Sequence, residues 1–287
     1  MDSDGDGVFD EYDTAGVMDP TVSSAEARLG DEREITSSLD LGIDSGSEIS
    51  LTTEVDEETT IRSGAVITSS ILNIGDDSKG GNAVVSGEAR VQELAIKGSS
   101  ELVLESGGIV SAQELVRVET GATLELKGAL TAPALTGDFS INDGGEASID
   151  RVTGNITMGQ GKATLNVVIG DVAISTGSVL ISEELTGDFT VANGGEATIE
   201  RLTGSVTMGE GTANIKTIIG NLDVGSGATI ITEELTGDFT IADNGQATVD
   251  NITGNVTMGE GTATFKKIVG AVNVSEGATF KSDDVEG

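Results

Sequence analysis

The sequence predicts an all-β protein, a single-stranded parallel β-helix (β-solenoid) with about 16–17 residues per turn. Three observations lead to this fold class. The chain repeats with a fixed period, apolar and polar residues alternate inside each repeat, and glycine separates the alternating segments. Aromatic residues make up only 2% of the chain, so aliphatic side chains must fill the core, and these suit thin, regular layers.

Three long segments repeat in the C-terminal half of the chain. Residues 135–184, 185–234 and 235–284 align without gaps, and each begins Leu-Thr-Gly-Asp-Phe. Each segment divides into three shorter units, which are 135–151, 152–167 and 168–184 in the first segment, so there are nine units in all. Self-similarity of this kind is the sequence signature of a solenoid, in which every repeat stacks on its neighbours.

Aligned as columns, the nine units share apolar positions that we expect to face the core. The first position is aliphatic from Leu135 to Ile268, glycine follows two residues later, and the fifth and seventh positions are apolar. Farther along comes a small residue (Ala147, Ala163, Ser178) and, two places on, a branched or aromatic one (Ile149, Leu165, Phe280). Side chains two apart share one face of a strand, and glycine permits a sharp corner. Each unit therefore forms one turn of short strands around a narrow core.

The three repeats each place one phenylalanine at the fifth position, in Phe139, Phe189 and Phe239. These residues are three turns apart, so each should pack among smaller residues such as Ile156 and Val172. Alternation of large and small side chains along a column fills a core without crowding.

The region 36–134 follows the same pattern with looser spacing. Residues 59–70 and 115–133 have the strand–glycine–strand form, and residues 76–82 have the composition of a loop between turns. We therefore expect irregular solenoid turns over 36–134, regular turns over 135–287, and a linker or N-terminal cap at 21–35.

An acidic segment near the N-terminus, within residues 1–20, has the spacing of a calcium-binding loop. Carboxylates occupy positions 1, 3, 5, 9 and 12 of the loop, a glycine occupies position 6, where the chain must turn, and a backbone carbonyl falls at position 7. The predicted ligands of Ca²⁺ are Asp2, Asp4, Asp6, the carbonyl of Val8, Asp10 and Asp13. The alternative is an acidic tail without fixed structure, which would not require Gly7 in register.

Composition narrows the classes of function. The chain has no Cys and no His, which excludes disulfides, thiolate chemistry and His-based catalysis or metal sites. The formal net charge of −34 opposes binding to nucleic acids and favours cations or basic surfaces as partners. No apolar run approaches the roughly 18 residues that a membrane helix needs, so we expect no membrane insertion. No clustered Asp–Lys–Arg arrangement stands out, and we expect that the protein is not an enzyme.

Three weaker signals have structural explanations as well as functional ones. The acidic pairs 183–184, 233–234 and 283–284 could collect divalent cations or be solvated corners. Threonine columns are typical of ice binding, yet they are broken in every third unit, as at Ile169, and β-propensity explains them. Four Asn-x-Thr/Ser sequons begin at Asn155, Asn251, Asn255 and Asn273; Thr-rich repeats generate such sequons by chance.

The units with Gly-[Asp/Asn] before one strand and Gly-x-Ala-Thr before the next resemble bactofilin-type, polymer-forming β-helices. This resemblance covers residues 135–287, and residues 36–134 more faintly. It implies a right-handed β-helix that stacks end to end into filaments. Solenoid modules of bacterial and archaeal surface proteins are similar to the same degree, and the Asp-rich segment resembles the calcium loops of thrombospondin type 3 and dockerin repeats. A left-handed helix built from hexapeptides is the alternative from spacing alone.

We expect from these features an extracellular or cell-surface structural or adhesive module whose N-terminal junction is stabilised by calcium. The chain would then be part of a longer secreted protein, since Met1 is followed directly by an acidic stretch rather than a signal peptide. Its partners would be calcium, itself through end-to-end or lateral assembly, or other surface components. The alternative is a cytoplasmic, bactofilin-like filament scaffold. A carbohydrate-active or carbohydrate-binding β-helix is less favoured, because exposed aromatic stripes are absent.

Overall fold

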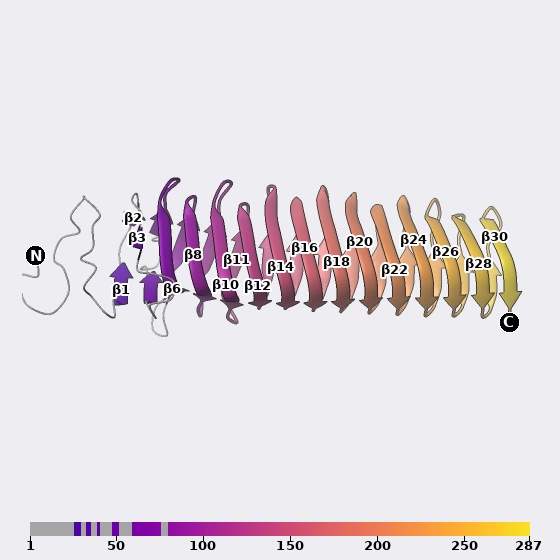
Figure 1. The fold of residues 1–287 in the computed structure, drawn as a ribbon. Helices are drawn as coiled ribbons and strands as arrows, with labels where there is room; N and C mark the ends of the chain where they lie inside the picture. Colours follow the sequence, from indigo (N-terminus) through magenta and orange to yellow (C-terminus); the bar gives the residue numbers. More distant parts are fainter. Residues whose placement is uncertain (1–25, 30–32, 36–38, 41–47, 52–58, 76–79) are drawn as a thin grey trace, which may run out of the picture.

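The computed structural model describes residues 26–29, 33–35, 39–40, 48–51, 59–75 and 80–287. Within these ranges every element of regular secondary structure is a strand, and the strands stack in chain order into a rod (Figure 1). The long sides of the rod are two parallel β-sheets, one built from long strands and the other from short ones. The predicted fold class, a single-stranded parallel β-solenoid, is confirmed.

The first sheet, here the long-strand sheet, has 16 strands, and in it each strand pairs in parallel with the strand of the next turn. Its strands are β1 (Glu26–Leu29), β3 (Leu39–Asp40), β4 (Glu48–Leu51), β6 (Val66–Ile74), β8 (Glu88–Ile96), β10 (Ile109–Val118), β12 (Ala129–Thr136), β14 (Gly145–Thr153), β16 (Gly161–Ile169), β18 (Ser178–Thr186), β20 (Gly195–Thr203), β22 (Gly211–Ile219), β24 (Ala228–Thr236), β26 (Gln246–Thr253), β28 (Thr262–Val269) and β30 (Thr279–Glu286).

The second sheet, here the short-strand sheet, has 14 strands that alternate along the chain with those of the first. Its strands are β2 (Arg33–Ile35), β5 (Thr59–Ile61), β7 (Asn82–Val85), β9 (Glu101–Leu104), β11 (Thr123–Leu126), β13 (Phe139–Ile141), β15 (Ile156–Met158), β17 (Val172–Ile174), β19 (Phe189–Val191), β21 (Val206–Met208), β23 (Leu222–Val224), β25 (Phe239–Ile241), β27 (Val256–Met258) and β29 (Val272–Val274).

The pairing register confirms the predicted unit boundaries. Phe139 lies opposite Ile156, Ile156 opposite Val172 and Val172 opposite Phe189, so the middle turn is one residue shorter than the turns on either side. The shorter turn lacks one residue at the corner between β15 and β16, where two residues join the strands. The corresponding corner between β13 and β14 has three residues. The length difference is therefore absorbed at one corner, and both sheets keep their register.

Each regular turn has three sides, because every long strand bends once. In β14, every second residue points inward as far as Ile149. The next two residues, Asp150 and Arg151, both point outward, and Val152 points inward again. A break in the period of two means that the strand turns a corner there. The second corner is the glycine after the long strand, and the third is the two- to four-residue loop after the short strand.

The predicted core columns are buried. All nine residues of the first column are at most 1% exposed, from Leu135 to Ile268. The fifth and seventh columns are buried as well, except in the last turn, where Val272 is partly exposed and Val274 is 39% exposed. Phe189 lies between Val172 and Val206 in its ladder, as the size alternation predicted. One continuous apolar core therefore runs along the described solenoid.

The predicted column of small residues is wrong in every third turn. The structure pairs Leu180, not Ser178, with Ala163, and it pairs Ser182 with Leu165. Phe280 likewise lies opposite Ala263, in the column predicted to be small. The prediction matched residues by size. The register is set instead by backbone hydrogen bonds, which pair residues at equal distances from the start of their long strands. A large side chain in one column is offset by a small one in the next column, so the core volume is conserved.

The less regular turns also belong to the solenoid. Strand β10 pairs with β8 and with β12, and the register shifts within it between Ala112 and Leu115. Part of the predicted loop at 76–82 lies outside the described residues, and the strand that follows begins at Asn82.

Candidate functional site

All the predicted calcium ligands lie outside the described residues. Asp2, Asp4, Asp6, Val8, Asp10 and Asp13 belong to residues 1–25, so the structure neither assembles nor separates them. In the part of the chain that is described, no group of three or more acidic, His or Cys side chains is placed to hold a metal ion. The calcium site therefore stays a prediction.

The Gly-[Asp/Asn] step forms a ladder of side chains along the second corner, here called the Asp/Asn ladder. In each pair, a side-chain oxygen accepts a hydrogen bond from the backbone amide of the equivalent residue one turn later. The pairs are Asp138 with the amide of Asn155 (2.7 Å), Asn155 with Asp171 (2.9 Å), Asp171 with Asp188 (2.8 Å), Asp188 with Ser205 (2.9 Å), Asn221 with Asp238 (3.1 Å), Asp238 with Asn255 (2.9 Å) and Asn255 with Ala271 (3.2 Å).

The Asp/Asn ladder gives four of the repeated carboxylates, Asp138, Asp171, Asp188 and Asp238, a structural role that needs no ligand. Each amide at this corner lies just outside the strand ladders, and the side chain of the preceding turn gives it a partner. Asn155 and Asn255 begin two of the sequons, and their side-chain oxygens are engaged in these bonds. The recurrent Gly-[Asp/Asn] step is visible in the sequence, but its role as a hydrogen-bond acceptor for the next turn is not. The signal was an acceptor side chain directly after glycine in one unit after another.

The acidic pairs predicted at a corner do lie at one. Glu183 and Glu184 are the two outward residues at the bend of β18, and the pairs at 233–234 and 283–284 take the same place in β24 and β30. Basic residues occupy this bend in other turns. We call the whole bend of β14–β30 the charged ridge. Its residues are Asp150, Arg151, Asn166, Val167, Glu183, Glu184, Glu200, Arg201, Lys216, Thr217, Glu233, Glu234, Asp250, Asn251, Lys266, Lys267, Asp283 and Asp284.

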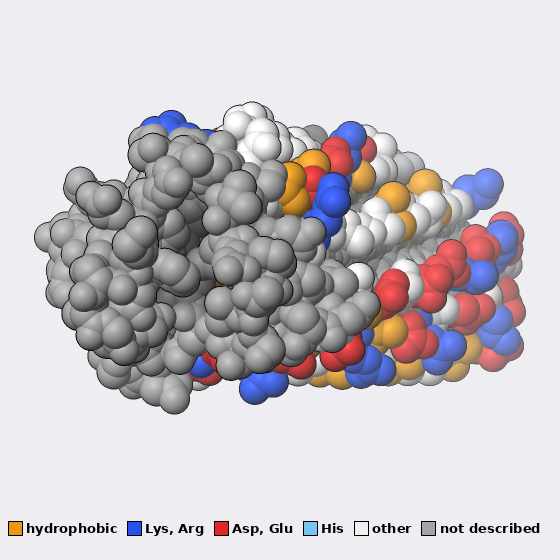
Figure 2. All heavy atoms as spheres, turned by 60° about the vertical axis from the view of Figure 1, so that its left-hand side comes forward, with side chains coloured by type: hydrophobic (Ala, Val, Ile, Leu, Met, Phe, Trp, Pro, Cys, Tyr) orange, Lys and Arg blue, Asp and Glu red, His pale blue; other side chains and the backbone are white. Residues whose placement is uncertain are grey.

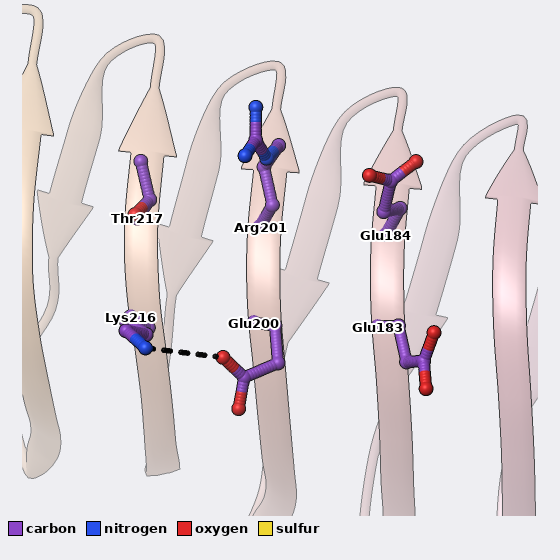
Figure 3. Close-up of a pocket in the computed structure, with 6 residues that line it drawn as sticks. All are labelled: Glu183, Glu184, Glu200, Arg201, Lys216 and Thr217. Atoms are coloured by element: carbon purple, nitrogen blue, oxygen red, sulfur yellow. Dashed lines mark ion pairs between the residues drawn. The ribbon is translucent and has the colours of Figure 1, made fainter.

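An open depression of about 480 Å³ lies on the charged ridge across β18, β20 and β22 (Figure 3). Its lining consists of Glu183, Glu184, Glu200, Arg201, Lys216 and Thr217. Glu200 and Lys216 point toward one another, and their charged groups are 3.6 Å apart (Figure 3). The lining has three carboxylates and two cations, all on exposed side chains, so it is a solvated mixed-charge surface rather than an enclosed site.

Ion pairs raise the pKa values of four basic side chains, Arg90, Lys127, Lys266 and Lys267. The pKa of Lys266 is raised because its ammonium donates a hydrogen bond to Asp250, one turn away on the charged ridge. The pKa of Lys127 is raised mainly by its hydrogen bond to Glu105, at 3.3 Å. These groups are exposed, where single ion pairs contribute little to stability. Lys127 and Lys266 therefore stay protonated at neutral pH.

The threonine columns face solvent. In the column of Thr153, every third residue is aliphatic, and Ile169, Ile219 and Val269 are 42%, 44% and 39% exposed. A matching column on β18 and β24 exposes Ile181 and Ile231 by 49% and 50%. The outer face of the long-strand sheet is therefore partly apolar, although the chain as a whole is strongly acidic.

Comparison with family models, with curated proteins and with solved structures finds no match to this chain. In the described part of the chain, no helix is long and apolar enough to span a membrane.

Proposed function

We propose that this chain is an extracellular or cell-surface structural module, a rigid rod whose N-terminal junction is stabilised by calcium. The observation that carries the proposal is the continuous apolar core, which runs without interruption beneath two parallel sheets. A solenoid of this kind is quasi-one-dimensional, since each turn contacts mainly its neighbours. Such a rod is suited to set a distance or to present a long surface.

The short corners support a non-enzymatic role. Between Ile141 and Val274, the short strands are joined to the next long strand by loops of two to four residues. Loops of this length cannot build the walls of a deep cleft, and ligand pockets are usually concave and enclosed. The depression on the charged ridge is open and lined by mutually neutralising charges. A carbohydrate-binding role would call for exposed aromatic side chains, and Phe139, Phe189, Phe239 and Phe265 are buried.

The spacing of Asp2, Asp4, Asp6, Asp10 and Asp13 supports the calcium junction. Hard oxygen ligands at these offsets suit Ca²⁺, and extracellular loops of this chemistry bind with Kd values of about 10⁻⁴–10⁻³ M. Such binding fits millimolar extracellular calcium. In this proposal, the ion orders the acidic segment and fixes the direction in which the rod leaves the preceding part of a longer protein.

Isothermal titration of the full chain with CaCl₂, repeated with MgCl₂, tests the junction. We expect one Ca²⁺ site that is lost in Asp6→Asn and retained in Asp223→Asn. Asp223 is an exposed carboxylate of β23, so its variant removes the same charge from the solenoid surface. Equal loss of calcium binding in both variants, or no binding by the wild type, would refute the junction.

The second candidate is a bactofilin-like filament scaffold. The uniform stacking favours it, because the strands of both sheets pair in parallel with constant order. Negative-stain microscopy of the full chain with and without calcium separates the two candidates. Filaments under both conditions would support the scaffold, and single rods under both would support the surface module.

A further inference from the structure

Two corners of the regular solenoid contain the dipeptide Asn-Gly, at Asn193-Gly194 and at Asn244-Gly245. Both asparagines lie in the loop between a short strand and the next long strand, and both are exposed. Both also have a positive φ, +49° at Asn193 and +61° at Asn244. A backbone amide attacks the preceding asparagine side chain most readily when it belongs to glycine, which has no side chain to hinder the approach. The sequence alone therefore marks the two sites as equal candidates for deamidation, the spontaneous loss of the side-chain amide.

The two dipeptides occupy different places in their corners. Counted at the period of 50 residues, Asn244 takes the place of Gly194, so the second dipeptide lies one residue later. The amides of these two residues make equivalent hydrogen bonds to the next turn, to the carbonyl oxygens of Glu260 (3.5 Å) and Glu210 (2.6 Å). The fold therefore gives the two asparagines different following glycines.

The amide that would attack Asn193 lies on an open corner. Gly194 is exposed, and a Cβ built on it would meet no atom within 4 Å. Its N–H donates to the carbonyl oxygen of Glu210, which is itself an exposed residue of the corner one turn later. The attack therefore breaks one hydrogen bond and displaces no packed group.

The amide that would attack Asn244 lies in packed surroundings. Gly245 is buried, and its N–H closes the corner by donating to the carbonyl oxygen of Ala242 (3.1 Å). A Cβ built here would lie 2.8 Å from Cγ1 of Ile241 and 2.9 Å from the carbonyl oxygen of Gly225. The same attack must therefore break a hydrogen bond and also move backbone that is held against the core.

The carboxamide of Asn193 is free to turn toward the glycine that follows it. It makes no hydrogen bond with a described residue, and no basic side chain lies on its side of the rod. Residues 129–287 contain 22 acidic and 7 basic side chains. The seven basic ones belong to the long-strand sheet: Arg151, Lys162, Arg201, Lys216, Lys266, Lys267 and Lys281. The short strands and their flanking corners hold ten acids and no base: Asp138, Asp143, Asp171, Asp188, Glu210, Asp223, Asp238, Asp243, Glu260 and Glu276. Figure 2 shows rows in which acidic and basic side chains mix, beside rows of uncharged side chains.

We propose that Asn193 is a site of spontaneous deamidation in the folded rod, and that the fold protects Asn244. Hydroxide removes the amide proton of Gly194, whose nitrogen then bonds to Cγ of Asn193 while the bond from Cγ to Nδ2 breaks. The side-chain nitrogen takes up a proton and leaves as ammonia, and a cyclic imide remains. Water opens the imide at one of its two carbonyl groups, to give aspartate or isoaspartate. The reaction needs no oxidant, reductant or enzyme.

The first repeat shows that the aspartate product fits this corner. Asp143-Gly144 occupies the same place one repeat earlier, and Asp143 has the same φ as Asn193, +49°. The amide of Gly144 donates to the carbonyl oxygen of Gln160 (3.0 Å), in the same way as the amide of Gly194 donates to the next turn. Deamidation to aspartate therefore converts the corner of the second repeat into that of the first, with one more negative charge on the side that has no base.

Incubation of the folded full chain at mildly alkaline pH, followed by tryptic digestion and mass spectrometry, tests the proposal. Trypsin separates the two sites, because its cleavage positions place them in the peptides 163–201 and 217–266. Fragmentation by electron transfer locates the modified residue and distinguishes isoaspartate from aspartate. We expect deamidation at Asn193 to be at least about tenfold faster than at Asn244, the equivalent of about 1.4 kcal/mol. Circular dichroism of each sample checks that the solenoid is folded.

The same chain unfolded in guanidinium chloride is the matched control, because both asparagines keep their glycine and only the fold is removed. The two sites should then react at rates within about twofold of one another. In Asn193→Gly the carboxamide is absent but a positive φ is still accepted, so the reaction at this corner should disappear from the folded chain.

Three outcomes would overturn the proposal: equal rates at the two sites of the folded chain, faster reaction at Asn244, or reaction at both sites only after unfolding. None of them bears on the calcium junction, because this inference does not depend on the proposed function.

Discussion

Replacing Gly220 by alanine should break the solenoid at the corner between β22 and β23. Gly220 has φ of +149°, and an added Cβ would lie 2.0 Å from the carbonyl oxygen of Gly204, one turn earlier. The carbonyl would have to move by about 1 Å, since non-bonded carbon and oxygen atoms need more than about 3 Å. That shift disrupts the hydrogen bonds from Gly204 to Ile219 (3.0 Å) and from Gly220 to Thr236 (2.9 Å).

Gly194 provides the matched control for this substitution. It also has a positive φ, +87°, yet an added Cβ would meet no atom within 4 Å. Both alanines carry a backbone strain of about 1–3 kcal/mol. Only Gly220→Ala adds the loss of two hydrogen bonds, at about 1 kcal/mol each. The free energy of unfolding should therefore fall by about 2 kcal/mol more in Gly220→Ala than in Gly194→Ala.

Urea unfolding followed by circular dichroism measures this difference. Amide hydrogen exchange localises it, because solenoids open turn by turn and the faster exchange should be confined to residues near 204–236. Equal destabilisation by the two alanines would refute the reasoning, since it would mean that the spacing between turns relaxes freely around the new methyl group.

Three further outcomes follow from the structure. Leu180→Ala should cost about 2–4 kcal/mol, and adding Ser182→Leu should recover part of this loss in thermal melts, because the two columns exchange volume. Asp188→Ala should destabilise the rod by about 1 kcal/mol in the same melts through the lost bond to the amide of the next turn, whereas Asp223→Ala should not. The raised pKa of Lys127 means that its ion pair stabilises the fold below the unfolded pKa and that this contribution is lost as pH rises through the higher folded pKa. The melting temperature should then fall less between about pH 10 and 12 in Lys127→Met than in the wild type.

Much of this fold was predictable because a solenoid is built from local rules. Alternation of apolar residues around Leu135, Phe139 and Ile141 predicts inward positions whether or not the neighbouring turns are known. Glycine at constant spacing predicts the corners, and the long internal repeat predicts the number of regular turns. The calcium loop, by contrast, is a prediction from ligand spacing that lies outside the described residues.

Register was not predictable from residue type. Ser178 and Ala163 were assigned to one column by size, but Ala163 is the third residue of β16 and pairs with Leu180, the third residue of β18. The Asp/Asn ladder escaped prediction for a related reason. Its hydrogen bonds join residues that are one full turn apart in the chain, and they exist only when successive turns stack in register.

By itself, the sequence determined that the chain is a β-solenoid, where its turns begin and which side chains fill its core. These properties depend on the alternation within each strand and on the recurrence of each turn, and both are visible in one dimension. Only the tertiary structure decided which outward residues share a face. The sorting of bases onto the long-strand sheet and the charged ridge both arise because stacking turns a recurrence along the chain into a surface. Net charge and composition do not reveal that sorting.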